Sequence, residues 1–160
     1  MVKIAVFPGS FDPFTVGHEA IVKKSLNIFD KVIIAVGANA LKKNYYALET
    51  RKEMIRKVFK DEPRVIVEHY EGLTVDFCKK QNARYILRGL RTAADFEFER
   101  AIAQVNKAMA PDVESVFLLT SPEHSPINST IVRDIIRSGG DASLFIPKAI
   151  NIKDYKRDEE

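Results

Sequence analysis

Ten residues near the N-terminus, Gly9–His18 (GSFDPFTVGH), combine the residue types of an anion-binding turn. Thr15 is typical of the residue that caps a helix, and Gly9 and Gly17 allow the backbone to approach a ligand closely. The free amides of a first helical turn and the positive end of the helix dipole attract anions. His18 falls in that turn, so the stretch suits a phosphate. The alternative is an ordinary turn shaped by glycine and proline, with His18 merely exposed.

A second stretch, RGLR, follows the apolar run RYIL and places Arg88 and Arg91 on either side of Gly89. A guanidinium group can hold a phosphate through two parallel hydrogen bonds. Two surface arginines are the alternative. That alternative weakens if this stretch and the first turn converge at neighbouring strands.

Two further stretches could add to the same site. In TSPEHSPINSTIVR, Asn128 or Ser129 can cap a helix and present a second set of free amides, and His124 either stacks on a base or is exposed. In GANALKKN, Lys42 and Lys43 are candidate point charges, although surface lysines are common.

These candidates need a scaffold, and the hydrophobic pattern predicts one. Short β-branched runs at 2–7, 31–36, 64–69, 83–87 and 114–119 alternate with helical patterns near 16–29, 48–60, 73–82, 93–109 and 129–138. Such alternation predicts an α/β fold with a five-stranded parallel sheet and helices on both faces. The loops that follow the strands then meet at one edge of the sheet, where open α/β sheets bind ligands.

Composition limits the remaining possibilities. The 160 residues suit a single domain over 1–160, with a solvated or frayed tail over about 152–160. The formal charge of +3 is spread along the chain, which argues against a nucleic-acid surface. We expect a cytoplasmic protein, because neither a signal peptide nor a membrane span is evident. The one cysteine, Cys78, excludes an internal disulfide, and the spacing of Cys and His residues does not suggest a zinc site. The phosphate-binding patterns G-x-x-x-x-G-K-[ST] and G-x-G-x-x-G are both missing.

Together the stretches resemble one family. PGSFDPFTVGH resembles the T/HxGH signature of the nucleotidyltransferase superfamily. RGLRTAADFEFE and INSTIVR, in this order, resemble bacterial phosphopantetheine adenylyltransferases over nearly the whole chain. The resemblance implies a Rossmann-like, doubly wound fold and transfer of AMP from ATP to 4′-phosphopantetheine, which gives dephospho-coenzyme A and pyrophosphate in coenzyme A biosynthesis. It also implies Mg²⁺ accompanying ATP, no metal ligands from the protein, and a homohexamer.

The same resemblance assigns roles by position. The catalytic residues would be His18, Lys42 and Arg91. The acceptor substrate would contact Ser10, Lys42, Thr74 and Arg88, with Asn106 near the pantetheine arm. ATP would contact the following set, which joins the first turn to the later stretches: Ser10, Phe11, His18, Gly89, Leu90, Arg91, Glu99, His124, Ser125, Pro126, Ile127, Asn128, Ser129 and Thr130.

The expected mechanism is direct in-line attack by the acceptor phosphate, without a covalent enzyme intermediate. We expect His18, Lys42 and Arg91 to supply fixed positive charge. Two alternatives are a different nucleotidyltransferase, such as a cytidylyltransferase or a nicotinamide-mononucleotide adenylyltransferase, and a non-catalytic nucleotide-binding module.

Overall fold

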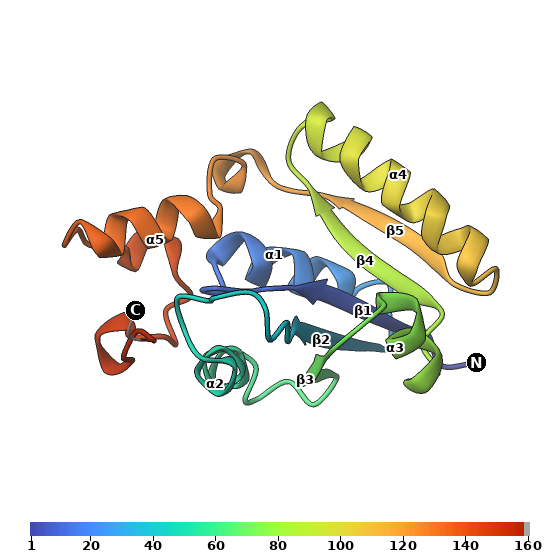
Figure 1. The fold of residues 1–160 in the computed structure, drawn as a ribbon, viewed down its shortest axis with the longest axis horizontal. Helices are drawn as coiled ribbons and strands as arrows, with labels where there is room; N and C mark the ends of the chain where they lie inside the picture. The colour runs from blue at the N-terminus through green and yellow to red at the C-terminus, as the bar shows by residue number, and fades with distance from the viewer. Residues whose placement is uncertain (159–160) are drawn as a thin grey trace.

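The computed structural model describes residues 1–158 and has one sheet of five parallel strands. The strands are β1 (Ile4–Gly9), β2 (Lys31–Gly37), β3 (Val65–Tyr70), β4 (Tyr85–Leu90) and β5 (Glu114–Leu119). Their order in the sheet is β3-β2-β1-β4-β5 (Figure 1). The chain therefore winds outward from β1 in one direction and then returns to β4 and winds in the other. The predicted Rossmann-like parallel sheet is confirmed, with its topological switch point between β1 and β4.

Within residues 1–158 the five α-helices are α1 (Val16–Ser25), α2 (Leu48–Val58), α3 (Thr74–Lys80), α4 (Ala93–Met109) and α5 (Ser129–Arg137). Apolar residues of α1 and α2 share one core cluster with one face of the sheet, and those of α3 belong to a cluster on the other face. None of these helices, in the part of the chain that the structure describes, combines the length and apolar character of a membrane span.

The interior strand β2, between β3 and β1, shows why a parallel sheet forms here. Val32, Ile34 and Val36 lie in the cluster with α1 and α2, whereas Ile33 and Ala35 lie in the opposite cluster, as strand alternation requires. All five are buried. A run that is apolar on both faces is stable only when helices cover both faces.

The end of β4 differs from the sequence prediction. RGLR was expected as a loop, but Arg88, Gly89 and Leu90 continue the strand because they pair with Phe117, Leu118 and Leu119 of β5. Gly89 has a packing reason to be glycine, since a Cβ there would lie 3.0 Å from Cγ1 of Ile21 on α1. Arg88 is therefore held by the sheet, and only Arg91 lies in the loop.

The C-terminal region agrees in part with the solvated or frayed tail expected over about 152–160, since Lys153, Asp154 and residues 156–158 are exposed. Ile152 and Tyr155 are partly buried and pack on a third apolar cluster that includes Tyr46, Met54 and Val132. This packing anchors the segment to the domain. Residues 159–160 lie outside the described part of the chain.

Candidate active site

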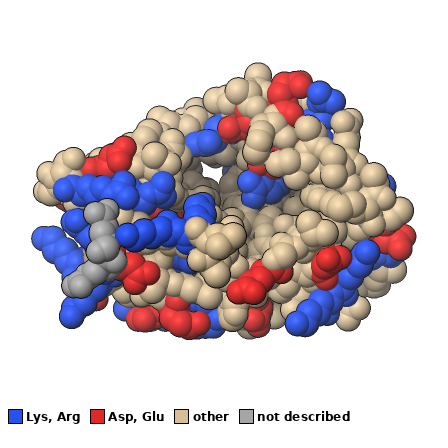
Figure 2. Space-filling view, in the orientation of Figure 1, with Lys and Arg blue, Asp and Glu red and all other residues tan. Residues whose placement is uncertain are grey.

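The carboxyl edge of the sheet holds a cavity of about 370 Å³ at the switch point. The ends of β1 and β4, the first turns of α1 and α5, and the loop after β2 all contribute to its wall. Figure 2 shows this face of the molecule hollowed near its centre, with basic side chains at the rim. The first turn and the arginine stretch thus converge as predicted, and His18, Lys42 and Arg91 line one cavity.

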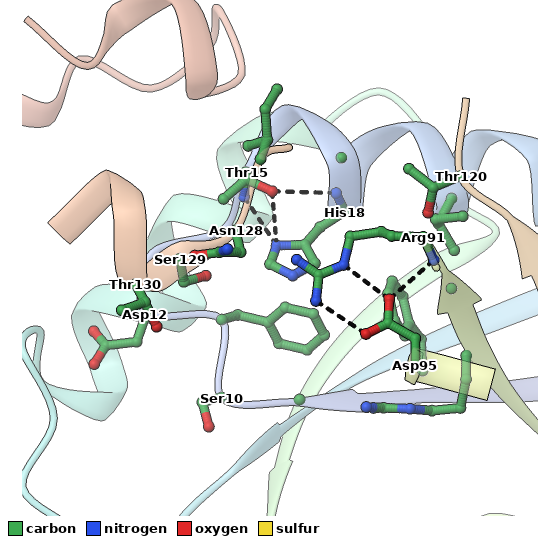
Figure 3. Close-up of a pocket in the computed structure, with 18 of the residues that line it drawn as sticks. Ser10, Asp12, Thr15, His18, Arg91, Asp95, Thr120, Asn128, Ser129 and Thr130 are labelled. Atoms are coloured by element: carbon green, nitrogen blue, oxygen red, sulfur yellow. Dashed lines mark hydrogen bonds and ion pairs between the residues drawn. The ribbon is translucent and has the colours of Figure 1, made fainter. Parts of the chain in front are cut away.

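His18 is fixed by the cap of α1 (Figure 3). The backbone N–H of Thr15 donates to Nδ1 of His18 at 3.0 Å, and the backbone N–H of His18 faces Thr15 Oγ1 at 3.4 Å. This reciprocal arrangement is a capping box in which histidine takes the place of the usual glutamate. Because Nδ1 accepts a backbone hydrogen bond, the proton of the neutral ring resides on Nε2.

The charge of His18 differs from the sequence prediction. Loss of water around the ring, aided by the positive charges of Arg88 and Arg91, lowers the pKa of His18 from 6.5 to about 3. The rings of Phe11 and Phe14, with centroids 5.0 and 5.3 Å from the imidazole, supply much of this apolar surrounding. His18 is therefore a neutral N–H donor at physiological pH and not the fixed positive charge that we expected.

The two arginines are already paired with carboxylates. Arg88 donates from Nε and Nη2 to Glu99 at 3.1 and 2.8 Å, and its Nη1 donates to the carbonyl of Pro8. Arg91 donates from Nε and Nη2 to Asp95 at 3.1 and 3.3 Å. Arg91 keeps Nη1 free of protein acceptors within residues 1–158, so it is better placed than Arg88 to take an incoming phosphate oxygen.

Lys42 lines the same cavity beside Ser10. Its Nζ is 3.2 Å from Ser10 Oγ, and among residues 1–158 it forms no ion pair with a carboxylate. Lys42 therefore carries an unbalanced positive charge beside a hydroxyl donor, as an anionic ligand requires.

Two buried residues that the sequence reasoning missed hold this part of the wall. Asp12 accepts hydrogen bonds from the backbone N–H groups of Tyr45 and Tyr46 at 2.7 and 2.9 Å, and so ties the first turn to the loop after β2. Arg51 donates to the carbonyls of Ser10 and Tyr46 at 2.7 and 3.0 Å. Except for the Tyr46 carbonyl, five residues before Arg51, their partners are backbone groups far along the chain, for which sequence spacing gives no signal.

The first turn of α5 forms the remaining wall. Asn128 caps the helix by accepting from the N–H of Ile131 at 2.9 Å, which confirms one of the two predicted caps. Ser129 donates its hydroxyl to the carbonyl of Pro13, and Arg133 donates to that of Asp12 at 2.8 Å. Arg133 also lines the cavity and was missed, although its position one helical turn after Ser129 could have indicated it.

A second cavity, of about 290 Å³, adjoins the first through Ser10, Arg88 and Glu99. Thr74 and Asn106 line it, and the hydroxyl of Thr74 lies 2.9 Å from that of Tyr70. Most of the residues predicted to contact ATP line the first cavity. The exceptions are Leu90, Ser125 and Pro126, which line neither cavity.

A parallel sheet with two helix N-termini, paired arginines and a lysine around one polar cavity is typical of Rossmann-like proteins that bind phosphorylated ligands. Comparison with known proteins narrows this class. Residues 6–135 match the family described as cytidylyltransferase-like. Phosphopantetheine adenylyltransferase of Flavobacterium psychrophilum is 56% identical over 95% of this chain and 100% of its own, and that of Bacteroides fragilis is 47% identical over 94% and 100%. The chain belongs to the phosphopantetheine adenylyltransferase family.

A solved structure supports the fold alone. A bifunctional NMN adenylyltransferase/ADP ribose pyrophosphatase from Francisella tularensis superposes with a TM-score of 0.73 at 20% identity. The match covers 94% of this chain, which spans about half (46%) of that longer protein.

The state of His18 can be measured directly. We predict that long-range ¹H–¹⁵N spectra of the imidazole show a neutral ring protonated on Nε2 at every pH from 5 to 8, because the folded pKa of about 3 lies well below that range. A His18→Gln variant assigns the signal. A ring that gains its second proton near pH 6.5 would contradict the neutral state.

Proposed function

We propose that this protein transfers AMP from ATP to 4′-phosphopantetheine, giving dephospho-coenzyme A and pyrophosphate in coenzyme A biosynthesis. The observation that supports this most is the single cavity that joins His18, Lys42, Arg91 and the first turns of α1 and α5. Family membership supplies the substrates, and the cavity supplies groups suited to both phosphorylated reactants.

The acceptor needs no general base. The second pKa of a phosphate monoester is about 6, so the phosphate of phosphopantetheine is largely a dianion at neutral pH and is already a nucleophile. The carboxylates that line the cavity have other tasks: Asp12 accepts backbone hydrogen bonds, and Asp95 and Glu99 pair with arginines. This arrangement suits direct attack on the α-phosphorus without a covalent intermediate.

Catalysis then depends on positioning of the two reactants and on N–H dipoles that stabilise the developing charge. Lys42 and Ser10 would hold the attacking phosphate from one side, while Arg91 and the amides of the α5 first turn would hold the leaving pyrophosphate from the other. The Nε2–H of His18, between them, would donate to the α-phosphate as charge builds on its oxygens. A neutral donor of fixed direction stabilises that charge without itself needing reorganisation.

We expect Mg²⁺ to arrive bound to ATP. No group of three or more His, Cys, Asp or Glu side chains within residues 1–158 could form a metal cage, and magnesium commonly binds through substrate phosphates with one or two carboxylates. When bound, it would neutralise phosphate charge. Asp95 and Glu99 line the cavity and are the carboxylates that would accept hydrogen bonds from its hydration shell.

The second cavity suits the pantetheine arm. It opens beside Ser10 and Arg88, where the acceptor phosphate would lie, and leads past Thr74 to Asn106. Hydroxyl and amide groups along an otherwise partly apolar channel match the amide bonds and short alkyl segments of that arm.

The homohexamer and the cytoplasmic location stay predictions. One surface supports association between copies of the chain. Along α4, partly exposed apolar residues recur at helical spacing: Phe98 (68% exposed), Ile102 (41%), Val105 (59%) and Met109 (42%). An apolar stripe of this kind on a helix suits contact with another subunit.

For His18, we predict that His18→Ala lowers kcat at least about a hundredfold, because one donor to the developing charge is lost. ATP affinity should change much less, and His18→Gln, which keeps an N–H donor, should recover part of the rate. Pyrophosphate release is measured with ATP and phosphopantetheine, and also with CTP or nicotinamide mononucleotide to test the other nucleotidyltransferase reactions. An unchanged kcat with weaker ATP binding would contradict this role.

For Lys42, we predict that Lys42→Met raises KM for phosphopantetheine at least about tenfold while KM for ATP changes little, because a charge-assisted contact to the acceptor phosphate is lost. Lys43→Met is the matched control, since Lys43 lines neither of the two cavities. A loss confined to ATP would mean that Lys42 serves the other reactant.

A further inference from the structure

The segment that carries Lys42 makes few contacts with the rest of the domain. Within it, the N–H of Lys42 donates to the carbonyl of Asn39 at 3.0 Å, and the N–H of Leu41 donates to the Asn39 side chain at 3.0 Å. Leu41 is 97% exposed. These hydrogen bonds shape the loop, but they do not fix its place over the cavity. Its position therefore depends on the residues where it joins the domain.

Those anchors are Ala38 and Tyr45. The N–H of Ala38 donates to the carbonyl of Tyr70 at 2.8 Å, which extends the β2–β3 pairing by one residue. At the other end, both backbone groups of Tyr45 are used: its N–H donates to Asp12, and its carbonyl accepts from the N–H of Asp158 at 2.9 Å. The C-terminal segment thus reaches the loop that carries Lys42.

Two guanidinium groups hold the ring of Tyr45. Arg137 of α5 lies 4.9 Å from the ring centroid, and Arg157 of the C-terminal segment lies 5.3 Å from it. Both distances are within the range of cation–π attraction. Figure 2 shows basic side chains gathered at this end of the molecule, where α5 and the C-terminus lie in Figure 1.

Arg157 also connects the ring to the helix. Its Nη2 donates to the carbonyl of Ile136 at 3.2 Å, in the last turn of α5, where carbonyls need donors. In the middle of the same helix, Arg133 donates to the carbonyl of Asp12. The contacts therefore form a closed circuit from Asp12 to Tyr45, through Arg157 to α5, and back to Asp12.

We propose that Tyr45 and Arg157 are positioning residues for the acceptor phosphate, because this circuit holds the loop so that Lys42 Nζ stays beside Ser10. The inference rests on the proposed function in taking Lys42 as a ligand of that phosphate. Pre-ordering the loop lowers the entropy that binding must otherwise supply. Binding of the acceptor should change more than binding of ATP, because the groups proposed to hold ATP lie on α1, β4 and α5.

The test compares Arg157→Leu with Lys156→Leu, two adjacent exposed cations on the same segment. We expect Arg157→Leu to raise KM for phosphopantetheine about threefold, the size of an exposed cation–π contact, with KM for ATP unchanged and only a slight fall in Tm. Lys156→Leu should leave both KM values and Tm unchanged. Arg157→Lys should raise KM for phosphopantetheine less than Arg157→Leu does. Equal kinetics for Arg157→Leu and Lys156→Leu would overturn the proposal, as would a rise in both KM values together with a fall in Tm.

A second pair of variants tests the ring. The hydroxyl of Tyr45 is buried without a hydrogen-bond partner among residues 1–158, so the ring is the part that matters. Tyr45→Leu should raise KM for the acceptor about tenfold, and Tyr45→Phe should restore it. If Phe and Leu behave alike, the cation–π contacts do not position the loop.

A measurement without turnover separates this proposal from the proposed function. Amide hydrogen exchange over residues 38–44 should be faster in Arg157→Leu than in Lys156→Leu, because opening of the loop is then less costly. This result is expected whatever the acceptor proves to be. Equal exchange in the two variants would overturn the circuit even if the wild-type enzyme uses phosphopantetheine.

Discussion

The hydrogen bond from the backbone N–H of Thr15 to Nδ1 of His18 determines how the site can handle charge. It satisfies one of the free amides at the start of α1, holds the ring in place, and leaves Nε2 as the proton carrier. A side chain that helps to begin a helix thereby also becomes a directed donor. Because the ring is poorly hydrated and lies near Arg88 and Arg91, it stays neutral and adds no further positive charge to the cavity.

Most of the other charges that line the cavity are also balanced within the protein. Arg88 and Arg91 are balanced by Glu99 and Asp95, so the site is not a cluster of unpaired cations that would repel one another before a ligand arrives. Lys42, like Arg133, has no carboxylate partner within residues 1–158, and Lys42 lies on an exposed loop. Oriented N–H groups on a rigid sheet edge and one cation on a separately held loop suit two phosphorylated reactants that must approach each other from different sides.

The architecture was predictable because it depends on local pattern. The apolar run of β2 and the helical stripes fix the sheet, and the chain order places the first turn beside β4. Other features depend on contacts distant in sequence. The state of His18 depends on the aromatic rings of Phe11 and Phe14, and the end of β4 depends on its pairing with β5. Arg51 and Arg157 act on backbone carbonyls that spacing does not reveal.

The central claim is that both reactants occupy one connected cavity, so that the acceptor phosphate attacks the α-phosphorus of ATP itself. The most direct measurement is the stereochemical course of the reaction with ATP made chiral at phosphorus by an α-phosphorothioate. A single in-line displacement predicts inversion of configuration in the dephospho-coenzyme A analogue. Retention would require two displacements through an adenylylated enzyme and would contradict the account.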